Sequence, residues 1–386
     1  MNPIISSIKT KFKSIFDQEP LIIRAPGRVN LIGEHTDYNN GFVLPAAIDK
    51  AIYLAMSKRT DEKIELVSVD LNENYSGSTD QVVRGNQGWT LYILGVVDEL
   101  QKAGHQIGGF NCVFSGDIPL GAGLSSSAAL ECGVAYGLNE LFDLKIEKVA
   151  LAKLSQKAEN EFVGVKCGIM DQFASMMGKK NAVIQLDCQS LEYEYNPLEM
   201  DGIEIVLFDS NVSHSLASSE YNTRRAQCET GVALVQQKYT EVKSLRDVTQ
   251  QMLDEVVKNA DPLVYRRCTF VVQENTRLLE GCEDLKRGDV AAFGQKMFAT
   301  HNGLSKNYEV SCKELDFLIE CVKGHPDVLG ARMMGGGFGG CTINLVRHAA
   351  VEKLVAEVAQ KYQQHMDKTL KTYVAQTADG VSVENA

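Results

Sequence analysis

The chain has 386 residues, enough for about two domains of ordinary size. Hydrophobic residues make up 44% of it and charged residues 23%, a composition that excludes disordered and fibrous proteins and is typical of a globular one. The formal net charge of −11 and the lack of any lysine- or arginine-rich run argue against a surface that binds nucleic acid or anionic lipid.

The N-terminal segment, residues 1–16, places apolar residues among lysines at a helical spacing. This pattern predicts a short amphipathic helix rather than a signal peptide. No stretch of the sequence approaches the roughly 20 apolar residues of a membrane span, so we expect no membrane partner. The 10 cysteines are scattered without a C-x-x-C pair, which predicts buried thiols, no zinc site and a cytoplasmic location.

The order of the expected elements indicates an α+β protein rather than alternating βαβ units. Strand-like runs of the first half lie at residues 21–24, 51–57, 64–69, 110–115 and 182–186. Helical periodicity follows at residues 127–142 and 146–162. The second half opens with a strand at 203–208, is helix-rich to about residue 325, and ends with a glycine cluster, a strand and a helix. No linker marks a boundary, and we place the two domains at residues 1–200 and 201–386.

A dense polar cluster lies at residues 24–41, with two arginines, two carboxylates, a histidine, a tyrosine and three asparagines. Burying so many polar groups is costly unless they pair with one another or with a polar ligand. The hydroxyls of a sugar both donate and accept hydrogen bonds, so a sugar could satisfy Glu34, His35 and Asp37 together. The alternatives are an exposed polar loop and a weak metal site formed by the same three side chains.

Glycines and serines at residues 119–130 directly precede the first strongly periodic helix. Glycine allows a close backbone approach, and the free N–H groups at the start of a helix favour an anion such as a triphosphate. The segment matches neither G-x-x-x-x-G-K-[ST] nor G-x-G-x-x-G, so it is neither a P-loop nor a Rossmann turn. The alternative is an ordinary serine-capped helix.

A second glycine-rich segment, residues 330–341, has five glycines among six residues ahead of an alternating strand at 342–346. Such a backbone can press against a neighbour without obstruction from side chains. The segment therefore predicts either direct contact with a ligand or a structural turn between domains.

Three segments of the chain resemble the motifs of one kinase family. Residues 27–49 resemble the galactokinase signature. Residues 119–130 and 330–346 resemble the second and third motifs of the wider GHMP superfamily of galactose, homoserine, mevalonate and phosphomevalonate kinases. The resemblance implies a two-domain GHMP-kinase fold, with an N-terminal mixed-sheet domain, a ferredoxin-like C-terminal domain and the active site in the cleft between them.

The same resemblance implies an enzyme that uses ATP and Mg²⁺ to phosphorylate the C1 hydroxyl of α-D-galactose, giving galactose 1-phosphate and ADP. We expect this enzyme to be a monomer. The implied sugar-binding residues are Glu34, His35, Thr36, Asp37, Gly168, Asp171 and Tyr221. The implied ATP-binding residues are Gly121, Ala122, Gly123, Leu124, Ser125, Ser126 and Ser127, and the implied magnesium ligands are Ser127 and Glu159.

In the family, the carboxylate matching Asp171 is the catalytic base, and the arginine matching Arg28 is its partner and stabilises the transferring phosphoryl group. Those roles suit a loose transition state, in which alignment and charge neutralisation supply most of the catalysis. Alternatively, Asp171 is only a helix-start aspartate. Two rival functions remain: a kinase for N-acetylgalactosamine or arabinose, and a non-catalytic sugar sensor. Such sensors have a shortened serine–alanine stretch, whereas residues 125–129 are complete here, which favours an active enzyme.

Overall fold

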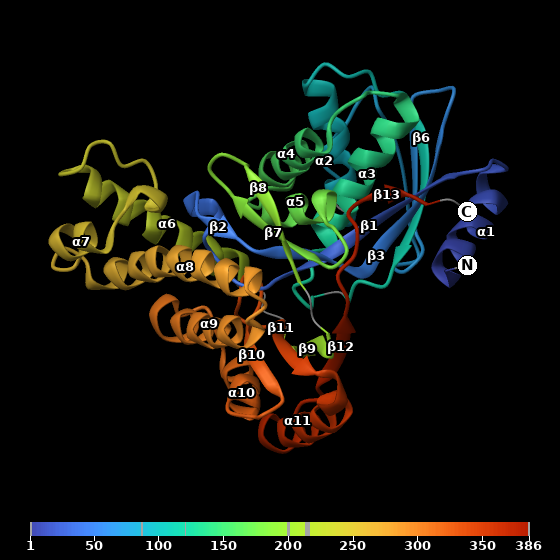
Figure 1. Cartoon of the computed structure of the whole chain (residues 1–386). Coiled ribbons are helices and arrows are strands. Elements are labelled where there is room, and N and C mark those ends of the chain that lie inside the picture. The colour runs from blue at the N-terminus through green and yellow to red at the C-terminus, as the bar shows by residue number, and fades with distance from the viewer. Residues whose placement is uncertain (1, 86–87, 120, 199–200, 213–216, 385–386) are drawn as a thin grey trace.

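The computed structural model describes residues 2–85, 88–119, 121–198, 201–212 and 217–384. The N-terminal part is built on a mixed sheet of six strands in the order β13-β1-β3-β6-β4-β5 (Figure 1). The strands are β1 (Leu21–Asn30), β3 (Pro45–Lys58), β4 (Lys63–Ser68), β5 (Glu73–Ser78), β6 (Phe110–Gly116) and β13 (Ser382–Val383). Only β4 and β6 pair in parallel among them.

Helices cover both faces of this sheet because successive residues of its strands point to opposite sides. Ile22 of β1 packs with the apolar stripe of α1 (Pro3–Phe16), whereas the next residue, Ile23, joins the main core on the other face. Among the helices that contribute to the main core are α2 (Gly88–Lys102), α3 (Ser126–Phe142) and α4 (Lys148–Lys157). The amphipathic N-terminal helix predicted from residues 1–16 is thus confirmed over the residues described.

The N-terminal part also contains a helical segment that follows α4 and a small second sheet. The chain leaves α4 through a π-helix, η2 (Ala158–Val163), and then forms α5 (Met170–Met177). A small sheet of β2 (Phe42–Val43), β7 (Ala182–Asp187) and β8 (Tyr193–Pro197) lies in the order β2-β7-β8. The predicted helix at 146–162 is therefore one α-helix followed by a π turn, a feature that often marks a functional position.

The C-terminal part contains an antiparallel sheet in the order β10-β11-β9-β12. Its strands are β9 (Ile203–Asp209), β10 (Val328–Met333), β11 (Cys341–Arg347) and β12 (Lys371–Ala375). The helices α10 (Lys313–Val322) and α11 (Val351–Met366) pack on one face, where Val206 and Phe208 of β9 are buried. This order of strands and helices is the ferredoxin-like arrangement, as expected.

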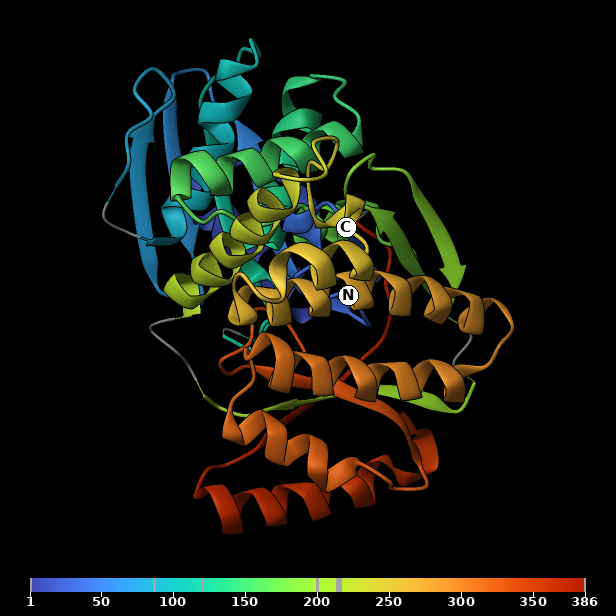
Figure 2. The same cartoon turned by 90° about the vertical axis from the view of Figure 1, so that its left-hand side faces the viewer.

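A large helical insertion lies in the chain between β9 and β10. It contains α6 (Ala217–Gln236), α7 (Gln250–Met252), α8 (Pro262–Lys286) and α9 (Val290–Gly303), with the π-helices η4 (Leu253–Val257) and η5 (Leu304–Tyr308). The 3₁₀ turns of the chain are η1 (Asp37–Asn39), η3 (Leu245–Asp247) and η6 (His348–Ala350). Figure 2 shows α8 and α9 running side by side between the N-terminal part and the C-terminal helices. No described helix is long and apolar enough to cross a membrane.

The division of the chain at residue 200 stays a prediction, because residues 199 and 200 lie outside the described ranges. One strand crosses the proposed division: β13, near the end of the chain, pairs with β1, where Val383 lies opposite Ile23. The C-terminal segment thereby completes the N-terminal sheet. The alternating pattern of a strand only two residues long is too short to be recognised in the sequence.

Candidate active site

An ion pair between Arg28 and Asp171 lies at the centre of the predicted site. Arg28 is near the end of β1 and is 4% exposed, and Asp171 is in the first turn of α5. The guanidinium donates from Nε to Oδ1 at 2.7 Å and from Nη2 to Oδ2 at 2.9 Å, and Nη1 donates to the carbonyl of Gly123 at 2.6 Å. Asp171 is therefore a paired carboxylate in a site, not only a helix-start residue.

The loop before α3 is pressed against β1. Gly121 and Gly123 have positive φ values of 76° and 74°, and the backbone N–H of Arg28 donates to the carbonyl of Leu124 at 3.2 Å. A Cβ on Gly27 would lie 2.7 Å from that same carbonyl oxygen, so only glycine fits there. The loop is thus held beside the Arg28–Asp171 pair by its own backbone.

Ser125 does not cap helix α3 through its side chain. It takes the N-cap position with a φ of 59°, and its hydroxyl donates instead to Oδ2 of Asp171 at 2.5 Å. The alternative of an ordinary serine-capped helix is therefore wrong for this residue. The N–H groups at the start of α3 lack that cap and are available to a ligand.

A cavity of about 420 Å³ opens beside the ion pair. It brings together eight predicted residues from distant parts of the chain: Arg28, Glu34, His35, Asp37, Glu159, Gly168, Asp171 and Tyr221. Thr36, also predicted to bind the sugar, does not line this cavity. Its side chain is fully buried and donates to the carbonyls of Gly33 at 3.0 Å and Phe42 at 2.6 Å, so it holds the loop rather than facing the cavity.

His35 is neutral in this cavity, because burial lowers its pKa to about 4. One ring nitrogen, Nε2, lies 3.2 Å from the carbonyl oxygen of Gly336 and must donate to it. The other, Nδ1, lies 2.8 Å from the hydroxyl of Tyr38 and accepts from it. This arrangement fixes the tautomer and orients the imidazole edge toward the cavity wall.

Asp37 and Gly168 are in direct contact. A Cβ on Gly168 would lie 1.9 Å from Oδ2 of Asp37, so no larger residue can stand there. Burial, together with the nearby charge of Asp171, raises the pKa of Asp37 to about 7. Asp37 can therefore act as a donor or as an acceptor toward a ligand near neutral pH.

The glycine cluster between β10 and β11 closes one side of the cavity. Gly335 and Gly336 line it, and the N–H of Gly335 donates to Oε1 of Glu34 at 2.9 Å. With the bond from His35 to Gly336, this loop contacts two predicted sugar-binding residues. The segment lines the cavity and contacts residues of the N-terminal part, while direct contact with a ligand stays a prediction.

A second cavity, of about 460 Å³, lies at the start of α3. Ser126 and Ser127 form one side, and three aromatic residues, Trp89, Tyr92 and Phe114, form the other. These aromatic residues were not predicted from the sequence to line a site, because a single aromatic side chain on a helix or strand usually indicates a buried core position. Trp89, the one tryptophan of the chain, was the available signal.

The start of α3 lies between the two cavities: Ser125 bonds Asp171 of the first, and the next residue, Ser126, lines the second. Glu159 lines the first cavity. Burial raises the pKa of Tyr92 to about 12, and Glu159 is close enough to contribute to that rise. Glu159 itself is 7% exposed, and burial together with Asp171 raises its pKa to about 7. The side-chain amide of Gln172 donates to Glu159 at 2.6 Å and to Glu131 at 3.1 Å.

This acidic region is suited to a hard cation. Glu131 is fully buried, and its Oε1 has no hydrogen-bond partner among the described residues. Glu131, Glu159 and Asp171 thus share a region in which Arg28 is their nearby cation. The hydroxyl of Ser127 and the carboxylate of Glu159 are the oxygen ligands that Mg²⁺ prefers. Within the described ranges, no group of three or more His, Cys, Asp and Glu side chains is arranged to hold a metal ion.

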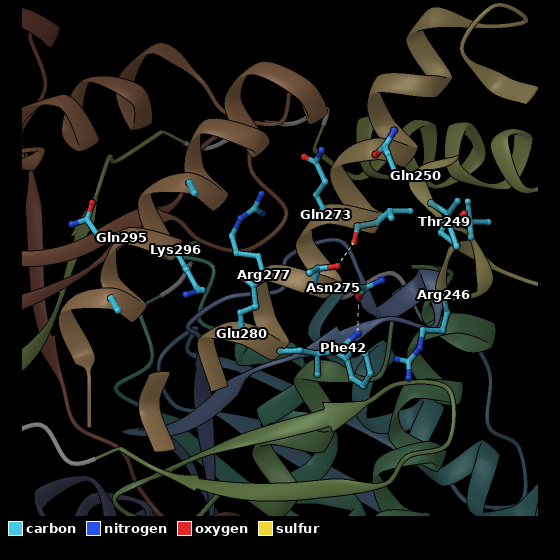
Figure 3. A pocket seen from close by; sticks show the side chains of 17 residues that line it. Phe42, Arg246, Thr249, Gln250, Gln273, Asn275, Arg277, Glu280, Gln295 and Lys296 are labelled. Atoms are coloured by element: carbon cyan, nitrogen blue, oxygen red, sulfur yellow. Dashed lines mark hydrogen bonds between the residues drawn. The ribbon is translucent and has the colours of Figure 1, made fainter. Parts of the chain in front are cut away.

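A larger groove of about 1070 Å³ lies apart from both cavities, along the outer side of α8 (Figure 3). Its three cationic side chains are already paired: Arg246 with Asp187, Arg277 with Glu274 and Lys296 with Asp284. The same helix supports the polar loop from below. Oδ1 of Asn275 accepts from the N–H of Phe42 at 3.0 Å, and Oε1 of Glu274 accepts from the N–H of Gly33 at 2.9 Å (Figure 3 shows the first).

Comparison with known proteins matches the chain to three family models. Residues 10–58 match the galactokinase galactose-binding signature, residues 91–179 the GHMP kinases N terminal domain, and residues 282–364 the GHMP kinases C terminal model. The chain is 42% identical over 375 residues to a galactokinase of Roseiflexus sp. (strain RS-1), covering 97% of this chain and 96% of that one. It is 40% identical over 390 residues to a galactokinase of Clostridium acetobutylicum, covering 99% and 100%.

Solved structures give the same picture. A crystal structure of Lactococcus lactis galactokinase complexed with galactose matches with a TM-score of 0.95 at 35% identity, covering 99% of this chain and 100% of that one. A mevalonate kinase of Methanococcus jannaschii matches with a TM-score of 0.64 at 18% identity, covering 93% and 99%, which supports the fold alone. The α+β GHMP-kinase fold predicted from the sequence is therefore confirmed.

The raised pKa of Asp37 predicts a particular pH dependence of stability. This side chain titrates near pH 4 in the unfolded chain and at about 7 in the folded one, so between those values the folded protein holds a proton that the unfolded chain releases. Its contribution to stability therefore falls as pH rises. Relative to Asp37→Asn, we expect the wild-type free energy of unfolding to fall by about 1 kcal/mol per pH unit and to level off above pH 7.

Urea unfolding of both proteins without ligand, at constant ionic strength, measures this difference. Asp61→Asn is the control, because Arg59 lowers the pKa of Asp61 to about 2 and the group stays ionised throughout the range. Equal slopes for the wild type and Asp37→Asn would contradict the prediction.

Proposed function

Because the chain belongs to the galactokinase family, we propose that its two adjoining cavities hold galactose and ATP and bring them together for phosphoryl transfer. The terminal phosphoryl group of ATP moves to the C1 hydroxyl of α-D-galactose, giving galactose 1-phosphate and ADP. The observation that carries this proposal is the bidentate Arg28–Asp171 pair, which lies on the wall of the sugar cavity and is bonded to the glycine–serine loop.

The cavity of about 420 Å³ is the sugar site in this proposal. Glu34 accepts from sugar hydroxyls, the neutral imidazole of His35 offers no charge that would need solvation, and Asp37 donates or accepts according to its protonation. Tyr221 adds an aromatic face next to His35, with ring centroids 5.4 Å apart. Gly168 keeps the wall thin where Asp37 approaches it. Thr36 contributes by holding this loop in shape.

Asp171 is the general base and Arg28 its partner. Asp171 orients the C1 hydroxyl and accepts its proton as the phosphoryl group arrives, while that hydroxyl oxygen forms the new bond to phosphorus and ADP leaves. Arg28 keeps its charge: burial opposes it, but Asp171 raises the pKa of Arg28 above its usual value. A fixed cation at this place stabilises negative charge as it spreads over the phosphoryl oxygens.

The loop of residues 121–127 holds the phosphates of ATP. Gly121, Ala122, Gly123 and Leu124 supply backbone without bulky obstruction, and Ser125 and Ser126 lead into the N–H groups of α3. The adenine base occupies the second cavity, where Trp89 and Phe114 lie with ring centroids 5.3 Å apart. This assignment rests on the apolar and aromatic lining, which suits the face of a purine.

Ser127 and Glu159 would hold Mg²⁺ together with the phosphates of the nucleotide. The ion would supply positive charge that brings ATP into a region otherwise rich in carboxylates. The supporting observation is the cluster of buried carboxylates, since Glu159 is 7% exposed and Glu131 is fully buried with its Oε1 unpaired among the described residues.

We also propose a cytoplasmic monomer. All ten cysteines are free, which suits a reducing compartment, and one chain supplies every residue of both cavities. Light scattering should give a mass near 42.4 kDa. A mass of twice that value would contradict the monomer.

A panel of sugars, each supplied with ATP and Mg²⁺, tests the substrate. We expect ADP release to depend on galactose and to be far weaker with N-acetylgalactosamine or arabinose, because the loop at residues 34–37 resembles the galactose signature. Calorimetry with galactose distinguishes the kinase from the other rival function, a non-catalytic sugar sensor. Tight galactose binding with no ADP release from any sugar would identify a sensor and contradict the kinase.

Replacing Asp171 by asparagine tests the base. The amide keeps the size of the side chain but cannot accept the proton, so we expect galactose binding to survive and kcat to fall on the order of 10²- to 10⁴-fold. Asp187→Asn is a matched control, since it removes a carboxylate that pairs with Arg246 and lines neither cavity. Wild-type kcat in Asp171→Asn would rule out the proposed role.

Replacing Trp89 by alanine tests the nucleotide cavity. Loss of a stacking surface worth about 1–3 kcal/mol should raise the KM for ATP roughly 10-fold and leave the KM for galactose unchanged. Trp89→Phe keeps an aromatic ring and should lie close to the wild type. An unchanged KM for ATP in Trp89→Ala would place the base elsewhere.

A further inference from the structure

Arg332 is a fully buried arginine of the third glycine motif that does not line the sugar cavity. It lies on β10, in the C-terminal sheet, and its guanidinium reaches across to the N-terminal part. Nε donates to the carbonyl of Leu31 at 2.7 Å, and Nη2 donates to the carbonyl of Asn30 and to Oε1 of Glu34, the latter at 3.0 Å. Nη1 donates to the carbonyl of Met333 at 2.6 Å.

The carboxylate of Glu34 is held by one oxygen only. Oε1 accepts from both Arg332 and the N–H of Gly335, at 3.0 and 2.9 Å. Among the described residues, Oε2 has no hydrogen-bond donor, and Glu34 is one of the residues that line the sugar cavity. The two donors on Oε1 therefore leave Oε2 as the atom that can accept from a ligand.

A carboxylate that is 2% exposed needs a compensating charge, and Arg332 provides it. The same guanidinium binds the carbonyls of Asn30 and Leu31, which follow Arg28 closely along the chain. It thus fixes Glu34 relative to the Arg28–Asp171 pair. This geometry sets the separation between a sugar-holding group and the group that takes the proton.

We propose that Arg332 is a positioning residue for the sugar: it orients and neutralises Glu34 so that Oε2 binds a hydroxyl of galactose. The inference rests on the proposed function, because it takes Glu34 as a sugar ligand. The inference goes beyond the proposed function because it assigns a role in substrate affinity to an arginine of the C-terminal sheet that does not contact the sugar. The contact of the C-terminal sheet with the N-terminal part then becomes a condition for galactose binding.

Two substitutions test this role. Arg332→Met removes the charge and every donor, and Arg332→Lys keeps the charge but cannot span Leu31, Asn30 and Glu34 together. For both variants we expect the KM and the Kd for galactose to rise by about 10- to 100-fold, as for loss of a charge-assisted hydrogen bond. The KM for ATP should change less than about 2-fold, and kcat should fall less than the KM rises.

Arg267→Met is the matched control. Arg267 is also a buried arginine, 2% exposed, but neither it nor its partners, the carbonyl of Asn307 and the carboxylate of Glu309, line the sugar cavity. We expect this variant to lose thermal stability as Arg332→Met does while keeping the wild-type Kd for galactose. A purely structural role for Arg332 would make the two variants behave alike.

A double-mutant cycle with Glu34→Gln gives an independent readout. If Arg332 acts through the Glu34 carboxylate, adding Arg332→Met to Glu34→Gln should weaken galactose binding far less than Arg332→Met does alone. Effects that simply multiply, or an unchanged Kd for galactose in both Arg332 variants, would overturn the inference while leaving the proposed function intact. If the wild-type chain binds galactose but releases no ADP, the kinase proposal is refuted, while the role of Arg332 can still be tested through the Kd for galactose. If the wild-type chain binds no galactose, both proposals are overturned.

Discussion

The site depends on an ion pair between a buried arginine and a partly buried aspartate that come from different elements. Arg28 belongs to a strand, and Asp171 lies 143 residues later in the chain, in a helix. Each side chain of the pair makes a further hydrogen bond: Arg28 donates to the carbonyl of Gly123, and Asp171 accepts from the hydroxyl of Ser125. A charged pair of this kind is costly to bury unless such hydrogen bonds accompany it. Strand β1, the glycine–serine loop and α5 are therefore fixed with respect to one another by one set of contacts.

Around this pair the environment is strongly acidic. Asp37 and Glu159 both have pKa values raised to about 7, chiefly by burial and also by the nearby charge of Asp171. The neutral His35 adds no charge to offset them. In the proposed function, these carboxylates would repel a bare triphosphate, so the nucleotide would need a cation beside it. That need would explain why an acidic region lies next to a loop shaped for phosphates.

Much of this could be predicted from the sequence, because the informative patterns are local. The alternation of apolar residues located most strands, and the three glycine- or polar-rich motifs identified the residues that the fold later brings together. The strand predicted at 21–24 in fact continues to Asn30, because Ala25 and Val29 are buried although polar residues interrupt the pattern. The Thr36 side chain was expected in the site and supports the loop instead.

What the sequence could not supply is the set of contacts between segments that are far apart in the chain or in different elements. The aromatic cavity combines α2 with β6, the strand β13 returns to β1, and Arg332 reaches Glu34 across 298 positions. No periodicity or motif spacing encodes such pairings, since they depend on how the sheets are placed. The third glycine motif shows why this matters. Its backbone contacts both Glu34 and His35, so a small displacement of the C-terminal sheet moves two walls of the sugar cavity at once. If this cavity holds the sugar as proposed, residues that set the contact between the two parts of the chain, such as Arg332, belong to the functional site even where they do not touch the substrate.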